Sequence, residues 1–225
     1  RQTREYLTAV RGLLNGETIN AQGSVVRLRN VRLGYKPPRV PVYLAALGPQ
    51  MLRLAGEAAD GVSLNWCSAE QVAWSREVIA EGAKKAGRDM AEVNVAEYIR
   101  ICVDDDEEAA RKALARATLG YALARPGASK EAGYRGHFGR MGFEAALTDL
   151  EDRRDAGAKT EELVERFPAE LLLKVGYFGK AAGAGPAFRK LSEGLDTSIA
   201  RVVPARPGDI ESVRAVMAAC APKAG

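Results

Sequence analysis

One turn in this sequence combines small residues with a glycine at the end of an apolar run, and such a turn could bind an anion. The segment Ala45-Ala46-Leu47-Gly48 closes the run, and an amphipathic helical pattern begins directly after it. Small side chains allow backbone N–H groups to approach an anion closely, and the start of the next helix adds partial positive charge. We also expect Gly48 to supply a backbone angle that larger residues avoid. A strand-to-helix turn would have this composition with or without a ligand, so the pattern indicates the position of a candidate anion site.

A second candidate region carries the only histidine of the chain. The segment 125–142 looks irregular and contains YRGHFGRMGF, in which His137 lies between Arg135 and Arg140. Long irregular segments in compact domains are often functional, so this segment is a candidate lid whose basic side chains could reach an anionic ligand. The alternative is a surface loop that its own aromatic residues hold in place.

Other chemistry is disfavoured by the residue inventory. No Ser-His-Asp, Cys-His or HExxH constellation can be assembled from one histidine in an irregular loop. The three cysteines, Cys67, Cys102 and Cys220, form no CxxC pair. The acidic run Asp104–Glu108 invites a metal interpretation, but an aspartate before a helical pattern is better explained as a helix cap. We therefore expect no metal.

Composition indicates a globular α/β protein of the cytoplasm. The 225 residues are 47% hydrophobic and 28% charged, which is enough apolar material for a sizeable core. No apolar run approaches the roughly 20 residues of a membrane span. The net charge of +4 is spread along the chain rather than clustered, and aromatic residues make up 6%. We therefore expect neither nucleic-acid nor membrane binding.

Hydrophobic periodicity predicts strands that alternate with helices, as in parallel α/β proteins. Ser68 stands where a helix needs its N-cap, with Glu70 in the first turn. A small hairpin is expected within 17–35, and Gly183 and Gly185 fit neither a P-loop nor a dinucleotide fingerprint. The predicted strands are 42–46, 62–64, 93–103 and 198–203. The predicted helices are 4–14, 49–59, 69–86, 107–123, 143–156, 161–167, 168–173, 188–193 and 209–220.

The stretch PVYLAALGPQMLRLAGEAADGVSLNW at residues 41–66 resembles the luciferase-like monooxygenase superfamily. It is most similar to the branch that depends on the deazaflavin coenzyme F420, which includes methylenetetrahydromethanopterin reductase-like proteins. The opening TREYLTAVRGLLNGETINAQG is similar to the family's helix and β-insertion, and the ending TSIARVVPARPGDIESVRAVMAAC to its last strand and helix. The resemblance implies a TIM barrel, in which the site lies at the carboxyl ends of the strands.

The resemblance also implies that part of the barrel lies outside this sequence. The chain opens at Arg1 in a helical pattern, and only about four barrel strands are apparent, whereas a full barrel typically needs about 250 residues. We therefore expect residues 1–225 to form a single domain that is the C-terminal portion of a TIM barrel and does not close by itself. Residues that face the flavin ring in the family belong to the absent portion, so no catalytic acid or base is assigned.

The family resemblance implies an oxidoreductase that uses F420, or alternatively FMN, for hydride transfer or monooxygenation of a small organic substrate. Backbone groups of Ala45, Ala46, Leu47 and Gly48 would bind the cofactor phosphate, although some relatives have glycine where this chain has Leu47. Asn65 and Trp66, at the end of the next strand, would complete the cofactor site. Homodimers are implied as well. The alternatives are a non-catalytic flavin-binding or scaffold relative, and a phosphate-binding barrel without redox chemistry.

Overall fold

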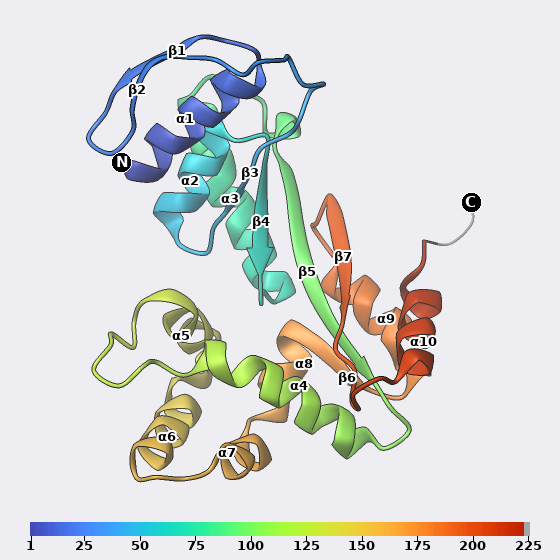
Figure 1. Ribbon diagram of the computed structural model, residues 1–225. Helices are drawn as coiled ribbons and strands as arrows, with labels where there is room; N and C mark the ends of the chain where they lie inside the picture. Colours follow the sequence, from blue (N-terminus) through green and yellow to red (C-terminus); the bar gives the residue numbers. More distant parts are fainter. Residues whose placement is uncertain (223–225) are drawn as a thin grey trace. The chain divides into compact units, whose positions relative to one another are not determined.

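The computed structural model of the protein describes residues 1–222, and these divide into two compact units (Figure 1). Unit 1 comprises residues 1–64 and 73–96, and unit 2 comprises residues 65–72 and the described residues from 97 onward.

Unit 1 opens with a helix that holds a hairpin. Glu5 of the first helix accepts hydrogen bonds from the N–H groups of Ser24, Val25 and Val26, in the loop that joins the hairpin strands. The two strands are antiparallel, as expected for 17–35. These elements are α1 (Gln2–Leu14), β1 (Ile19–Gln22) and β2 (Arg27–Val31).

A parallel strand–helix–strand unit follows. Strand β3 (Tyr43–Ala45) pairs in parallel with β4 (Gly61–Asn65), and α2 (Pro49–Ala58) connects them. Asp60 fixes the start of β4, because its carboxylate accepts the Val42 N–H at 2.8 Å. The predicted parallel pairing of these two strands is thus confirmed.

Helix α2 and the following helix approach each other almost backbone to backbone. The second helix, α3 (Ala69–Lys85), is followed by a 3₁₀ turn, η1 (Met90–Glu92). A Cβ atom added to Gly56 would lie 2.0 Å from the Ile79 carbonyl oxygen, and one added to Gly82 would lie 2.1 Å from that of Arg53. Both glycines are needed because no side chain fits in either place.

Strand β5 (Asn94–Val103) begins in unit 1 and continues in unit 2, where two further strands pair with it. In unit 2 it pairs in parallel with β6 (Gly176–Gly179), with Arg100 opposite Gly176, and it also pairs with β7 (Thr197–Val202). The strand order is β3-β4-β5-β6 with β7 joined to β5. Strand β6 was not predicted, because two of its four residues are glycines.

Helices supply most of unit 2 and its core. Leu114, Leu147, Leu171 and Leu172 are fully buried in one cluster together with Trp66. The helices are α4 (Glu107–Ala122), α5 (Gly133–Phe138), the π-helix η2 (Gly139–Phe143), α6 (Glu144–Asp155), α7 (Thr160–Arg166), α8 (Ala169–Val175), α9 (Ala181–Leu191) and α10 (Ile210–Cys220).

Two predictions for unit 2 were wrong. Helix α9 begins at Ala181 rather than 188 and includes Pro186, so the small-residue stretch is helical. The segment 133–142, expected to be irregular, forms α5 and most of η2, with Gly142 in the left-handed region at a φ of 96°. Of the candidate lid, only residues 125–132 lack a helix.

Candidate functional site

The turn Ala45–Gly48 lies in unit 1, between the end of β3 and the start of α2. Ala46 is buried and donates its N–H to the Ser63 carbonyl at 3.3 Å, which holds the turn against β4. Gly48 is the N-cap of α2 and makes no side-chain cap, and no acidic residue lies in the first turn of the helix. Pro49, the first residue of α2, has no N–H, and Met51 donates its N–H to the Gly48 carbonyl at 3.1 Å. This helix start therefore offers an anion the Gln50 N–H and the positive end of the helix dipole.

Gly48 does not adopt a conformation restricted to glycine. Its φ of −100° and ψ of 158° are ordinary extended values, so the expectation of a special backbone angle was wrong. Instead, the space around it is open, because a Cβ added at Gly48 would meet no other atom within 4 Å. What glycine provides here is room beside the helix terminus.

Trp66 lies in unit 2 at the centre of an aromatic cluster. Its side chain is fully buried, and its backbone has a φ of 61°, which is rare for a residue of this size. The rings of Tyr121 and Phe138 pack against the indole at centroid distances of 5.6 and 6.2 Å, and Tyr134 packs against Tyr121 at 5.0 Å. These contacts fix the indole and support its unusual backbone conformation.

Arg100 and Asn65 join this cluster through a chain of polar contacts. The guanidinium carbon of Arg100 lies 3.7 Å from the Trp66 ring centroid, which is the geometry of a cation–π contact. The Asn65 amide nitrogen donates to the Tyr134 hydroxyl at 2.6 Å, while the Asn65 amide oxygen accepts from Arg100 Nη1. Asn65 is thereby held with its oxygen toward the arginine.

A buried acid lies next to this cluster. Glu97 is 1% exposed and accepts the Cys67 N–H at 2.7 Å through Oε1, while Oε2 has no partner among the described residues. Burial raises the pKa of Glu97 to about 8, against the lowering effects of the Cys67 N–H and Arg100. Glu97 is therefore mainly protonated at neutral pH.

His137 and Cys67 form a neutral pair. The Nε2 atom of His137 lies 2.8 Å from the Trp66 carbonyl oxygen and 3.8 Å from Cys67 Sγ. A carbonyl oxygen can only accept, so Nε2 carries the ring proton. Burial lowers the pKa of His137 to about 4 and raises that of Cys67 well above its usual range. The pair therefore has no thiolate, and the ring nitrogen next to the thiol already carries a proton, so it cannot accept the thiol proton as nucleophilic catalysis requires.

The basic residues of the candidate lid have different surroundings. Arg135 is 3% exposed and donates to Glu151 at 2.9 Å and to Thr148 at 3.0 Å, so its charge is already paired within unit 2. His137 is buried as described, and Arg140 is exposed. This arrangement favours the alternative in which aromatic and polar contacts hold the segment in place, and a ligand role for the three residues stays a prediction.

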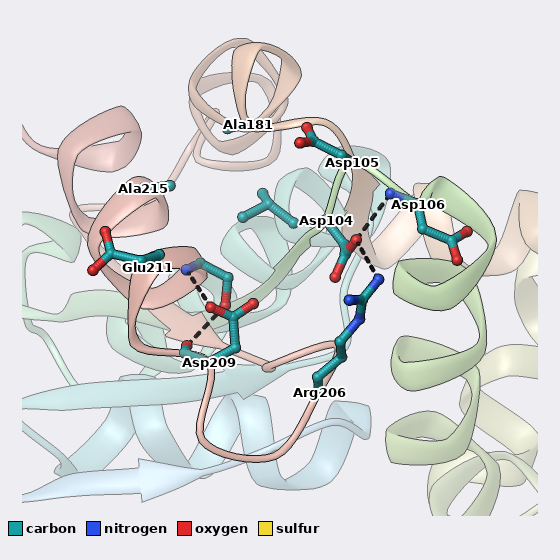
Figure 2. A pocket seen from close by; sticks show the side chains of 10 residues that line it. Asp104, Asp105, Asp106, Ala181, Arg206, Asp209, Glu211 and Ala215 are labelled. Carbon is teal, nitrogen blue, oxygen red and sulfur yellow. Dashed lines mark hydrogen bonds and ion pairs between the residues drawn. The ribbon is translucent and has the colours of Figure 1, made fainter.

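A cavity of about 700 Å³ opens in unit 2 at the end of β5, next to the acidic run (Figure 2). Its acidic residues have structural partners. Asp104 accepts from the Asp106 N–H at 2.9 Å and from Arg206 at 3.3 Å, Asp106 caps α4 at Ala109, and Asp209 caps α10. The helix-cap interpretation of the run is thus confirmed. Among residues 1–222, no three His, Cys, Asp or Glu side chains converge in a way that could bind a metal ion.

Glu97 and Arg100 were missed as site residues. The available signal was that both are charged residues within the apolar run VNVAEYIRICV. A charge inside a buried strand requires a partner or a function, and that rule would have identified both positions.

A family model described as luciferase-like monooxygenase matches residues 1–178, so the chain belongs to this family. The 5,10-methylenetetrahydromethanopterin reductase of Methanolobus tindarius is 40% identical over 111 residues, which cover 49% of this chain and 34% of that protein. The F420-dependent glucose-6-phosphate dehydrogenase of Rhodococcus erythropolis is 34% identical over 111 residues, or 48% of this chain and 33% of that protein. The matched part thus spans about a third of the length of these relatives.

Solved structures confirm the fold class. The coenzyme F420-dependent tetrahydromethanopterin reductase of Methanopyrus kandleri superposes with a TM-score of 0.74 at 22% identity, over 95% of this chain and 60% of that one. The α/β fold is thus that of the luciferase-like TIM barrels. Within the described part of the chain, no helix is both long and apolar enough to cross a membrane.

Proposed function

We propose that this chain is part of an oxidoreductase that uses coenzyme F420, with FMN as the alternative, to transfer hydride to or from a small organic substrate or to oxygenate it. The observation that carries the proposal is the turn Ala45–Gly48, which opens onto the uncapped start of α2. The named relatives include enzymes that depend on F420, which favours the deazaflavin over the flavin.

The turn fits the phosphate of such a cofactor in three respects. The space beside Gly48 is open, no side chain caps the helix, and no carboxylate in the first turn would repel an anion. Leu47 is half-buried, and its side chain takes no part in the backbone donors of the turn. The backbone of Ala45, Ala46, Leu47 and Gly48 would hold the phosphate, and the bound deazaflavin would supply hydride chemistry at its C5 atom.

Asn65 and Trp66 would act by position. The indole is immobilised by rings on several sides, and the Asn65 amide is oriented by Arg100 and Tyr134. Trp66 is fully buried, so it would act indirectly, by holding Arg100 and its own neighbour Asn65 in place. No residue of this chain is assigned as a catalytic acid or base.

Fluorescence titration of the full-length protein with F420, and separately with FMN, tests the proposal. Gly48→Val places a branched side chain in the open space beside the helix terminus. The loss of one or two charge-assisted N–H bonds, at roughly 1.5–3 kcal/mol each, predicts binding weaker by about tenfold to several hundredfold.

Gly34→Val is the matched control, because a Cβ at Gly34 also meets no other atom within 4 Å. It should leave the affinity for both cofactors unchanged. Circular dichroism must show that both variants are folded. A folded Gly48→Val protein with the parent's affinity for F420 and FMN would place the phosphate elsewhere.

A further inference from the structure

Arg100 is a buried cation to which the described residues supply no salt bridge. It is 3% exposed, and the buried acid that acts on its charge, Glu97, is mainly protonated at neutral pH because its pKa is raised to about 8. The equally buried Arg135, in contrast, forms an ion pair with Glu151 at 2.9 Å. Burial of an unpaired charge is costly, so a site that retains one usually meets an opposite charge from a ligand.

The guanidinium of Arg100 is held so that one edge remains available. Nη1 donates to the Tyr98 carbonyl at 3.0 Å and to the Asn65 amide oxygen, and the plane rests on Trp66. In the described part of the chain, Nε and Nη2 have no acceptor. These two groups form the edge that binds a carboxylate or phosphate through two parallel hydrogen bonds.

The charges around Arg100 favour an anion. Burial first, and then the positive charge of Arg201 on β7, lower the pKa of Arg100 to about 10, so the side chain stays protonated at neutral pH. Glu97 is mainly uncharged there, because its pKa is about 8. The local field is therefore positive.

Exposed apolar surface borders this charge. Tyr98 lies on the same face of β5 as Arg100, two residues before it, and is 42% exposed. Tyr121, whose ring centroid lies 6.0 Å from the Arg100 guanidinium carbon, is 38% exposed. A ligand with a flat apolar body and one anionic group would match both features.

We propose that Arg100 binds the anionic group, a carboxylate or a phosphate, of a substrate with a flat apolar body, and that Arg201 adds a second positive charge. Nε and Nη2 of Arg100 make the two hydrogen bonds, and Asn65 and Trp66 position the guanidinium. The inference rests on the proposed oxidoreductase function and names the substrate class of that enzyme.

Isothermal titration calorimetry of the full-length protein tests the proposal with three probes. Benzoate combines the two required features, inorganic phosphate has the charge alone, and benzamide is the uncharged counterpart of benzoate. We expect benzoate to bind the parent at least tenfold more tightly than benzamide does.

Arg100→Gln should weaken benzoate binding by about tenfold or more, since it removes a charge and a bidentate pair. Arg100→Lys should weaken benzoate binding by about threefold to tenfold, because the positive charge remains but the two parallel N–H donors of the guanidinium are lost. Arg201→Gln should have a smaller effect, and the exposed control Arg116→Gln should have none. Unchanged benzoate affinity in folded Arg100→Gln would overturn the proposal.

Titration with F420 and FMN separates this inference from the proposed function. In Arg100→Gln, a loss of benzoate affinity that exceeds any loss of F420 or FMN affinity supports a substrate site, because Arg100 also orients Asn65. Loss of F420 affinity with no change for benzoate would assign Arg100 to the cofactor and overturn the proposal. If the parent binds neither cofactor but benzoate binding depends on Arg100, the oxidoreductase assignment fails while the anion site stands.

If neither Arg100 variant folds, chemical protection of the parent protein tests whether Arg100 binds the anionic group. Phenylglyoxal modifies arginines whose guanidinium it can reach, and mass spectrometry locates the modified residues. If Arg100, which is 3% exposed, is not modified in the free protein, its guanidinium edge is closed to ligands and the proposal fails. Protection of Arg100 by benzoate, but not by benzamide, supports the site. Modification of Arg100 at the same rate with and without benzoate refutes it.

Discussion

Glu97→Gln should remove a pH dependence of stability that the parent protein shows above neutral pH. Glu97 is 1% exposed, and burial raises the pKa of its carboxyl group to about 8 from the ordinary value of 4.5. Between these two pH values the folded state holds a proton that the unfolded state has lost. Stability therefore falls as pH rises through this window.

The size of the effect follows from this window. His137 acts in the opposite sense, because burial lowers its pKa to about 4 from 6.5, so its contribution increases with pH and is complete above pH 6.5. Of these two groups, only Glu97 still changes the stability as pH rises above 6.5. Its slope is close to 1.4 kcal/mol per pH unit near pH 6.5 and about half of that at pH 8, so the parent should lose about 1.5 kcal/mol over this interval.

Urea unfolding of parent and variant at pH 6.5, 7.25 and 8 measures this difference. The free energy of unfolding is meaningful only if fluorescence and circular dichroism give coincident transitions. The buried amide of Glu97→Gln lowers the free energy of unfolding by an amount that is the same at each pH. This amount therefore cancels when the change in stability between pH values is compared for parent and variant. Equal losses of stability in parent and variant would show that Glu97 ionises normally and that the reasoning from burial is wrong.

Three further predictions concern the turn, the core and assembly. Leu47→Gly should leave the affinity for F420 within about twofold of the parent in fluorescence titrations, because only backbone donors are invoked, and a tenfold loss would implicate the leucine side chain. Phe138→Ala should lower the free energy of unfolding by about 3–5 kcal/mol in urea, since the ring is fully buried against Trp66, and a loss under 1 kcal/mol would contradict that packing. The full-length protein should be a dimer by light scattering at micromolar concentration, as the family resemblance implies, and a monomer would refute this.

The alternation of strands and helices could be predicted because buried parallel strands appear as short apolar runs. The runs at 42–46, 62–64, 93–103 and 198–203 correspond to β3, β4, β5 and β7. Strand β6 has no such signal, since it is GYFG and owes its conformation to pairing with Arg100–Val103 of β5. Helix α9 contains two glycines and a proline, yet it is helical because Gly185 lets it pack closely on the Ala219 carbonyl of α10. Tertiary contacts outweighed local preference at both places.

The candidate site could be predicted only where its residues are contiguous in the sequence. The turn Ala45–Gly48 is a contiguous pattern, so its position was apparent. The cluster around Trp66 joins residues as far apart as Asn65 and Tyr134, and no spacing rule connects them. Arg135 looked free in the sequence because its partner, Glu151, lies sixteen residues away on another helix.

The close approach of α2 and α3 bears on how this protein could be engineered. Replacement of a helical glycine by alanine usually stabilises a protein by roughly 0.4–1 kcal/mol, because it restricts the unfolded chain. At Gly56 and Gly82 the added methyl group would overlap a carbonyl oxygen of the facing helix, so the two helices would have to separate. Helix α2 also carries the turn that we assign to the cofactor phosphate, so a routine stabilising substitution several residues away would shift the ligand-binding end of the helix. A library designed to raise thermal stability should therefore keep both glycines fixed.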